Sequence, residues 1–357
     1  MDAAPPSIPP VTGGGLGHPG HFAGQGNVMD VTPTGSRLVA IGYTVPAFRG
    51  ATWITTDRQT WTLAELAGGD QPTVPTAIAH EPDGATVAVG RAGGRAAAWW
   101  TADPPAWMAV GGGDAFVEPP ETRMTSVVAT DHGFAAGGWA GLITQPGHPR
   151  FWTSPDGRTW SRAGDASSRD DGRVAAIAAG PGGLVAVGTM GPFGHATGGA
   201  AWRSGDGGTT WTRIDDPDLA IGDLRSVTAS GSGYVAVGTT LDQTAAVVLV
   251  SRDGRAWDRI EDDTLTYHGL GVTMSDVVAG ADGGLVAVGH FLFGQQYGQG
   301  TAWTSPDGRT WTRMPDEAAF GQAEPLAVIP DGGGYVAVGT VGAPDNFIPT
   351  VWLSPAR

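Results

Sequence analysis

The chain has 357 residues and a formal net charge of −15, with 35 acidic and 20 basic side chains, so its field opposes phosphate backbones and anionic lipid. We therefore expect no nucleic-acid partner, and no apolar run approaches the 18 or more residues of a membrane span. The absence of cysteine excludes disulfides and thiol nucleophiles, while 59 Gly and 27 Pro beside 41% hydrophobic residues indicate a packed fold with many tight turns.

The chain begins with a Pro-rich segment, MDAAPPSIPP, which has the composition of a linker. This segment has neither the basic start nor the apolar stretch of a signal peptide. We expect an exported, extracytoplasmic or secreted protein whose signal segment is absent from this chain.

Seven copies of one short apolar string follow along the chain at a nearly constant spacing. They read LVAIG, TVAVG, FAAGG, LVAVG, YVAVG, LVAVG and YVAVG, and they end at Gly42, Gly90, Gly138, Gly188, Gly238, Gly289 and Gly339. Each of the first six is followed by a turn that ends in tryptophan, at Trp61, Trp107, Trp160, Trp211, Trp257 and Trp311. A period of roughly 50 residues is typical of propellers and solenoids.

Residues 274 to 314 show the content of one unit most clearly. MSDVVAG, LVAVG, TAWTS and WTRM predict four short strands, joined by ADGG, a longer loop and SPDGRT. Radial packing buries both faces of such sheets, so seven units predict an all-β, seven-bladed propeller of four-stranded antiparallel blades. We expect one domain over residues 1–357, with blades near 28–62, 75–110, 123–163, 173–214, 224–260, 273–314 and 324–357.

The last unit is incomplete, because it stops after its third strand, TVWLS at 350–354. Propellers commonly close their ring with a strand borrowed from the other terminus. We therefore expect part of residues 1–14, around Ser7 to Thr12, to pair beside Val351 to Ser354. The prolines of this segment suit an edge strand.

The turns that end in tryptophan share an Asp-Gly pattern. They read SPDGRTW at 154–160 and 305–311, SGDGGTTW at 204–211 and SRDGRAW at 251–257, with degenerate copies at 57–61 and 103–107. These turns resemble the Asp-box (BNR) repeats of sialidase-type propellers, whose usual pattern is Ser-x-Asp-x-Gly-x-Thr-Trp. The aspartate can accept N–H bonds of its own turn, and the tryptophan can pack between blades, so we expect a structural role. One carboxylate per turn is too few oxygens for calcium. We expect no metal and no cofactor.

Long loops between second and third strands lie on one face of a propeller, together with the connections between blades. A ligand should bind there, because recognition residues concentrate on loops of a rigid scaffold. The candidate ligand-binding residues on these loops are His195, His290, Phe293, Tyr297 and Phe347. Loops that pack on one another are the alternative explanation.

A second group of candidates comes from aligning the starts of the first strands. Seven residues should ring the mouth of the central channel there: Asn27, Val74, Arg123, Arg173, Asp223, Thr273 and Glu324. From this ring we take Asn27, Arg123, Arg173, Asp223 and Glu324 as ligand-binding candidates. Two arginines near an aspartate and a glutamate could hold a sugar acid. They could equally form an internally paired, water-filled channel.

An enzyme of this fold remains an alternative. The sialidases that the turns resemble are six-bladed and bind the substrate carboxylate with three arginines, the first usually in an Arg-Ile-Pro motif that this chain lacks. Sialidase activity is therefore disfavoured. Other glycoside hydrolysis needs two carboxyl groups, for which Asp223, Asp276 and Glu324 are the catalytic candidates.

The weak catalytic signal favours a non-catalytic, monomeric propeller that presents its loop-rich top face to a small molecule, a glycan or a protein partner. Seven-bladed propellers with such repeats, in photosystem assembly factors and receptor ectodomains, present a face to protein partners. The alternative is a carbohydrate-active enzyme, a glycoside hydrolase or lyase, with its site at the central channel. Three convergent arginines or two close carboxylates on the top face would favour a ligand site. A flat, apolar face would favour a protein partner.

Overall fold

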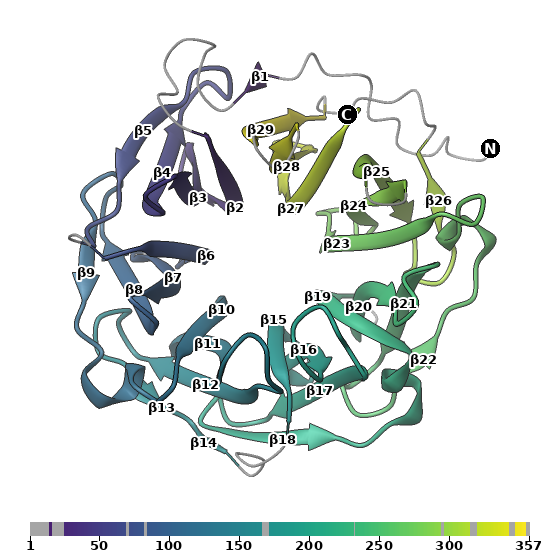
Figure 1. Cartoon of the computed structure of the whole chain (residues 1–357), viewed down its shortest axis with the longest axis horizontal. Helices are drawn as coiled ribbons and strands as arrows, with labels where there is room; N and C mark the ends of the chain where they lie inside the picture. Colours follow the sequence, from purple (N-terminus) through teal and green to yellow (C-terminus); the bar gives the residue numbers. More distant parts are fainter. Residues whose placement is uncertain are drawn as a thin grey trace.

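Seven antiparallel sheets stand around a central axis, and the first strand of each sheet lines the centre (Figure 1). The computed structural model describes residues 14–15, 25–68, 71–81, 84–165, 171–231, 233–293, 296–314, 320–342 and 347–354. Helix within these ranges is limited to three short 3-10 turns, η1 (Gly113–Phe116), η2 (Pro217–Ile221) and η3 (Asp263–Leu265). The predicted all-β, seven-bladed propeller is confirmed.

The strands of each blade follow one another from the axis to the rim. Blade 1 contains β2 (Gln25–Thr34), β3 (Arg37–Val45), β4 (Arg49–Thr55) and β5 (Thr62–Glu65). Blade 2 contains β6 (Thr73–His80), β7 (Thr86–Ala92), β8 (Arg95–Thr101) and β9 (Met108–Val110). Blade 3 contains β10 (Thr122–Thr130), β11 (Gly133–Ala140), β12 (His148–Ser154) and β13 (Ser161–Arg162). Blade 4 contains β15 (Arg173–Gly180), β16 (Gly183–Met190), β17 (Gly198–Ser204) and β18 (Thr210–Ile214), and the short strand β14 (Gly164–Asp165) pairs parallel with β18. Blade 5 contains β19 (Gly222–Ser230), β20 (Gly233–Thr240), β21 (Ala246–Ser251) and β22 (Asp258–Arg259). Blade 6 contains β23 (Gly271–Ala279), β24 (Leu285–Phe293), β25 (Gln296–Ser305), β26 (Thr312–Arg313), and blade 7 contains β27 (Ala323–Asp331), β28 (Gly334–Val341), β29 (Ile348–Leu353).

The N-terminal segment completes blade 7. Strand β1 (Gly14–Gly15) pairs antiparallel with β29, with Gly14 opposite Val351 and Gly15 opposite Thr350. Figure 1 shows this strand beside β29, between the last blade and the first. Closure of the ring by the N-terminal segment is therefore confirmed. The pairing predicted for residues 7–12 lies outside the described residues.

The apolar core lies in the seams between neighbouring blades. Second strands are buried on both faces, as in the run Leu38–Ile41, whose side chains are at most 1% exposed. Large aromatic side chains fill the seams from both sides. Phe151 of blade 3, for example, stacks on Trp211 of blade 4 with ring centres 4.1 Å apart. Because each sheet buries both faces against its neighbours, the blades stabilise one another.

The glycine that ends each repeated string packs against the first strand of its own blade. A Cβ atom at Gly188 would lie 1.8 Å from the carbonyl oxygen of Arg173, and one at Gly138 would lie 2.0 Å from that of Arg123. The same close approach, 1.8 to 2.2 Å, occurs in all seven blades. No larger residue fits without moving the backbone, which explains why the string always ends in glycine.

Each first strand carries a β-bulge directly after this contact. The register shifts occur after Val28, Pro75, Met124, Val174, Leu224, Met274 and Pro325. A bulge turns side chains out of the regular alternation and leaves backbone groups without ladder partners. Seven bulges at one level therefore leave backbone groups near the axis that side chains can bind.

Side chains beside the bulges bind the backbone of the next blade. Asp30 Oδ2 accepts the Ile78 N–H at 2.9 Å, and Asp276 Oδ2 accepts the Val328 N–H at 2.8 Å. Ser126 Oγ accepts the Ile177 N–H at 3.0 Å. The aligned polar residues below the mouth thus act as links between blades.

The turns between third and fourth strands form closed hydrogen-bond networks. Asp156 Oδ1 accepts the N–H groups of Arg158 and Thr159 at 2.8 and 2.7 Å, and the Trp160 indole donates to the Gly157 carbonyl at 3.0 Å. Comparable bonds occur in the turns that end at Trp211 and Trp311. These turns, which we call the Asp–Trp turns, lie on the face opposite the ends of β3, β7 and β11 that carry the mouth.

Deleting residues 1–15 should open the ring. The deletion exposes the edge of β29 and removes its ladder bonds, each worth about 1 kcal/mol, so the melting temperature should fall by several degrees. A deletion of residues 1–13 that keeps β1 is the matched control and should melt close to the full chain. Equal losses in the two deletions, measured by circular dichroism, would contradict closure by Gly14 and Gly15.

Replacing Trp311 by alanine should lower the free energy of unfolding by about 3–5 kcal/mol, because a buried aromatic side chain leaves a cavity. Trp311 is 2% exposed and packs in the seam between blades 5 and 6. Chemical denaturation measures the loss, and ligand affinity of the folded protein should not change. Weaker binding without a loss of stability would place function at the Asp–Trp turns.

Candidate functional site

Two sets of side chains lie at one end of the first and second strands, and we call this end of the central axis the mouth. The first set consists of the residues predicted at the starts of the first strands. The residue after each repeated glycine stands opposite them on the second strand, giving the pairs Asn27–Tyr43, Val74–Arg91, Arg123–Trp139, Arg173–Thr189, Asp223–Thr239, Thr273–His290 and Glu324–Thr340. The channel mouth is therefore built from two strands of every blade.

Three arginines follow one another on blades 2, 3 and 4, and we call Arg91, Arg123 and Arg173 the arginine row. The Trp139 ring lies between two of them, with Arg123 Cζ 4.1 Å and Arg173 Cζ 4.4 Å from its centre. Burial lowers the pKa of both buried guanidinium groups, and the neighbouring arginine lowers each further. Since an arginine side chain loses its proton only in strongly basic solution, both remain cationic at neutral pH.

The arginine row is only partly paired. Arg123 Nη2 donates to Glu121 Oε2 at 2.6 Å, and Arg173 Nη2 donates to the Ile143 and Gln145 carbonyls at 3.0 and 2.6 Å. Within the described residues, no carboxylate forms an ion pair with Arg173 or Arg91. The Nε atoms of Arg123 and Arg173 are buried without a hydrogen-bond partner there. The row thus concentrates more positive charge than its neighbours neutralise.

Acidic and basic groups gather on blades 5 to 7, and we call Asp223, Arg225, His290 and Glu324 the blade 5–7 cluster. Arg225 Nε lies 3.5 Å from Asp223 Oδ2, and the Thr189 hydroxyl of blade 4 donates to the same carboxylate. Arg225 is the extra residue of the β19 bulge, between Leu224 and Ser226. The bulge therefore places its guanidinium among the mouth residues.

The environment sets the protonation states in this cluster. Burial raises the pKa of Glu324, and the positive charge of Arg225 opposes part of that rise. Burial and, to a smaller extent, the charge of Arg225 together lower the pKa of His290 to about 4, so the imidazole is neutral at pH 7. His290 is 7% exposed, and its Nδ1 is buried with no partner in the described structure. A carboxyl that keeps its proton to higher pH is suited to act as a general acid.

The remaining predicted residues lie in different places. Asn27 Nδ2 donates to the Tyr43 hydroxyl at 2.6 Å, and the Phe347 carbonyl accepts the Gly26 N–H at 3.2 Å. His195 is exposed on the loop after Pro192, and Phe293 and Tyr297 belong to β24 and β25. Ligand contacts by these residues stay predictions.

Asp276 lies below the mouth, where it links blades 6 and 7. Its Oδ1 accepts the Ser226 hydroxyl at 2.5 Å, and its other oxygen accepts the Val328 N–H. Burial raises its pKa. These bonds give the Asp276 carboxyl a structural role. The catalytic roles of Asp276, Asp223 and Glu324 stay predictions.

Two residues of the site escaped the sequence alignment. Arg91 follows the repeated glycine of blade 2, so aligning the residue after each string would have found it. Arg225 occupies a bulge, where the alternation of inward and outward residues fails. Only the observed register of β19 places Arg225 at the mouth.

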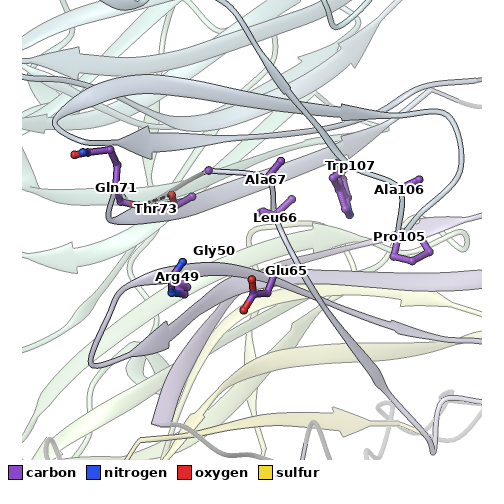
Figure 2. Close-up of a pocket in the computed structure, with 11 residues that line it drawn as sticks. Arg49, Gly50, Glu65, Leu66, Ala67, Gln71, Thr73, Pro105, Ala106 and Trp107 are labelled. Atoms are coloured by element: carbon purple, nitrogen blue, oxygen red, sulfur yellow. Dashed lines mark hydrogen bonds between the residues drawn. The ribbon is translucent and has the colours of Figure 1, made fainter.

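Two cavities lie away from the mouth, in the seams beside blade 2. One of about 470 Å³ lies between blades 1 and 2, lined by Arg49, Glu65, Gln71 and Trp107 among others (Figure 2). A second, of about 550 Å³, lies between blades 2 and 3 beside the alanines of β8. None of the paired mouth residues lines either cavity. Among the described residues, no three His, Cys, Asp or Glu side chains gather as a metal site.

Solved structures with the same fold include enzymes named for sugar substrates. A Penicillium chrysogenum α-L-arabinanase complexed with arabinobiose matches with a TM-score of 0.52 and 12% identity, over 96% of this chain and 98% of that one. A protein of unknown function from Dyadobacter fermentans matches with a TM-score of 0.53 and 12% identity, over 94% and 95%. A Trypanosoma rangeli sialidase in complex with the inhibitor DANA matches with a TM-score of 0.53 and 10% identity, over 92% and 54%.

This chain thus spans about half the length of the sialidase, and identities this low show a shared propeller fold alone. No protein-family model matches the chain, and no curated protein matches it. Within the described residues, no helix is long and apolar enough to cross a membrane.

Replacing Asp30 by asparagine should change how stability depends on pH. Burial and the charge of Asp276 raise the pKa of Asp30 to about 7, whereas its ordinary value is 3.8. The stability this raised pKa contributes is full below pH 3.8 and is lost as pH rises through about 7. The wild type should therefore lose on the order of 1–4 kcal/mol relative to Asp30→Asn between pH 4 and 8. Urea unfolding at several pH values measures this, and parallel curves would contradict it.

Proposed function

We propose that this propeller is a carbohydrate-active enzyme that binds an acidic sugar at the channel mouth and hydrolyses its glycosidic bond. The observation that carries the proposal is the arrangement of the mouth. The arginine row occupies blades 2 to 4, and a carboxyl with a raised pKa, Glu324, belongs to the facing blades 5 to 7. Binding and proton transfer are thus assigned to opposite halves of one opening.

The arginine row binds the carboxylate of the sugar. Guanidinium groups form charge-assisted, often bidentate hydrogen bonds to carboxylates, and these are among the stronger polar contacts in proteins. The Trp139 ring holds the guanidinium groups of Arg123 and Arg173 in place from one side. Less reorganisation is then needed when the ligand binds.

Glu324 and Asp223 share the hydrolysis. Protonated Glu324 donates its proton to the glycosidic oxygen as the bond to the anomeric carbon breaks. Asp223, which lies beside Arg225 and Thr189, accepts a proton from the water that attacks this carbon. The products are two sugars with free hydroxyl groups, and both carboxyls then exchange protons with solvent to start again.

Other observations support an enzyme over a non-catalytic propeller. The non-catalytic function expected from the sequence gains no support from the mouth, which carries converging charges instead of a flat apolar face. The similar arabinanase and sialidase structures fit the carbohydrate-active alternative. We also propose that the Asp–Trp turns are Asp-box repeats and that the protein acts as an exported monomer.

Calorimetry with galacturonic, glucuronic and sialic acids tests binding, with galactose as the neutral comparison. An Arg123→Ala/Arg173→Ala variant should lose about 10- to 100-fold in affinity for the acids, because it removes two charged donors. The matched control is Arg252→Ala/Arg255→Ala, which removes two exposed arginines on the opposite face. No binding of any acid by the wild type, or equal losses in the two variants, would contradict the site.

Incubation with polygalacturonate, hyaluronan and alginate tests hydrolysis. One of these should yield new reducing ends without unsaturated products, and Glu324→Gln should abolish the release while keeping the binding. Since burial raises the pKa of Glu324, activity should persist above glutamate's ordinary pKa of 4.5 and fall as Glu324 ionises. Unsaturated products would contradict hydrolysis in favour of elimination. Binding of acids with no cleavage of any polymer would return the protein to the non-catalytic class.

A further inference from the structure

An exposed aromatic side chain stands beside the arginine row. Phe193, in the loop after β16, is 66% exposed, and its ring centre lies 6.0 Å from Arg173 Cζ. Leu142 and Ile143, in the loop after β11 of blade 3, are 36% and 45% exposed. A phenylalanine this exposed contributes little to folding, so its position calls for another explanation.

Backbone contacts fix the two loops to each other. The Phe193 N–H donates to the Ile143 carbonyl at 3.2 Å, and Arg173 Nη2 donates to the same carbonyl at 3.0 Å. The Gly172 N–H donates to the Gly147 carbonyl at 2.6 Å, and the His195 N–H donates to the Pro192 carbonyl at 3.0 Å. Arg173 and Phe193 therefore share the Ile143 carbonyl as an acceptor, which connects the arginine row to the loop that carries Phe193. The aromatic ring is held at a fixed place relative to the mouth.

We infer that Phe193 is a platform for a second sugar unit, so the ligand is an acidic oligosaccharide or polysaccharide and not a single sugar acid. The inference rests on the proposed function, because it needs one acidic unit bound at the arginine row. The next unit of the chain then lies over Phe193. A pyranose ring presents a face of C–H groups that packs on an aromatic face, and the rigid ring loses little entropy when it is covered.

A protein partner fits this surface less well. Three partly exposed side chains give far less than the roughly 800 Å² per partner of a specific protein interface. The neighbouring mouth is charged and polar, which suits a ligand that alternates carboxylates with apolar ring faces. One exposed aromatic ring beside a row of cations matches the size of one sugar unit.

The test compares galacturonic acid with tetragalacturonate in the Glu324→Gln background, where the oligomer is not cleaved. The tetramer should bind more tightly than the monomer, and Phe193→Ala should weaken tetramer binding about tenfold while leaving the monomer unchanged. Phe193→Trp, which keeps a flat ring, should retain the tetramer affinity. Leu241→Ala is the control, since it truncates another apolar side chain of a top-face loop, 42% exposed, on blade 5.

The outcomes separate this inference from the proposed function. Equal affinities for monomer and tetramer, or no effect of Phe193→Ala on the tetramer, overturn the platform and leave the acidic-sugar site standing. No binding of either probe by the wild type overturns the platform, and the proposed function falls with it only if glucuronic and sialic acids also fail to bind. A parallel loss for monomer and tetramer in Phe193→Ala, with none in Leu241→Ala, also overturns the platform, because Phe193 would then act only by supporting Arg173.

Discussion

The contact between a glycine of each second strand and a backbone carbonyl of the neighbouring first strand is the constraint on which the site depends. It brings two strands of one blade closer than any side chain allows, and the first strand bulges directly after it. The constraint involves only the glycine and backbone atoms. The side chain of the residue that supplies the carbonyl, and that of the residue after the glycine, can therefore differ from blade to blade. Seven nearly identical blades can therefore carry arginine, aspartate, histidine and glutamate around one opening.

The mouth shows how local charge can oppose the charge of the whole chain. The protein carries a formal charge of −15, yet Arg91, Arg123 and Arg173 lie together on three consecutive blades. Exposed charges more than about 8 Å away are largely screened at physiological salt, whereas buried or partly buried neighbours are screened much less. Trp139 adds attraction without adding a counter-charge, so the guanidinium groups stay close together and remain available to an anion.

The sequence was sufficient to predict the fold because the repeat records the packing of one blade seven times. The same alignment identified Arg123, Arg173, Asp223 and Glu324 as equivalent positions near the starts of first strands, which the register of each blade confirms, while their ligand contacts stay predictions. The alignment could not locate Arg225, because a bulge changes which residues project to the axis. It also could not identify the residues of the closing strand, because Gly14 and Gly15 carry no apolar pattern that sets a register. Nor could it show that Asp276 links two blades, since this depends on the spacing between sheets.

The account rests on one claim, that the arginine row holds a carboxylate while Glu324 faces the bond to be broken. A crystal structure of the Glu324→Gln protein soaked with tetragalacturonate tests this claim most directly. The account predicts a sugar carboxylate within hydrogen-bond distance of Arg123 and Arg173, with a glycosidic oxygen beside residue 324. An oligosaccharide bound in the seams of blade 2, or at the mouth with its carboxylates turned away from the arginines, would contradict it.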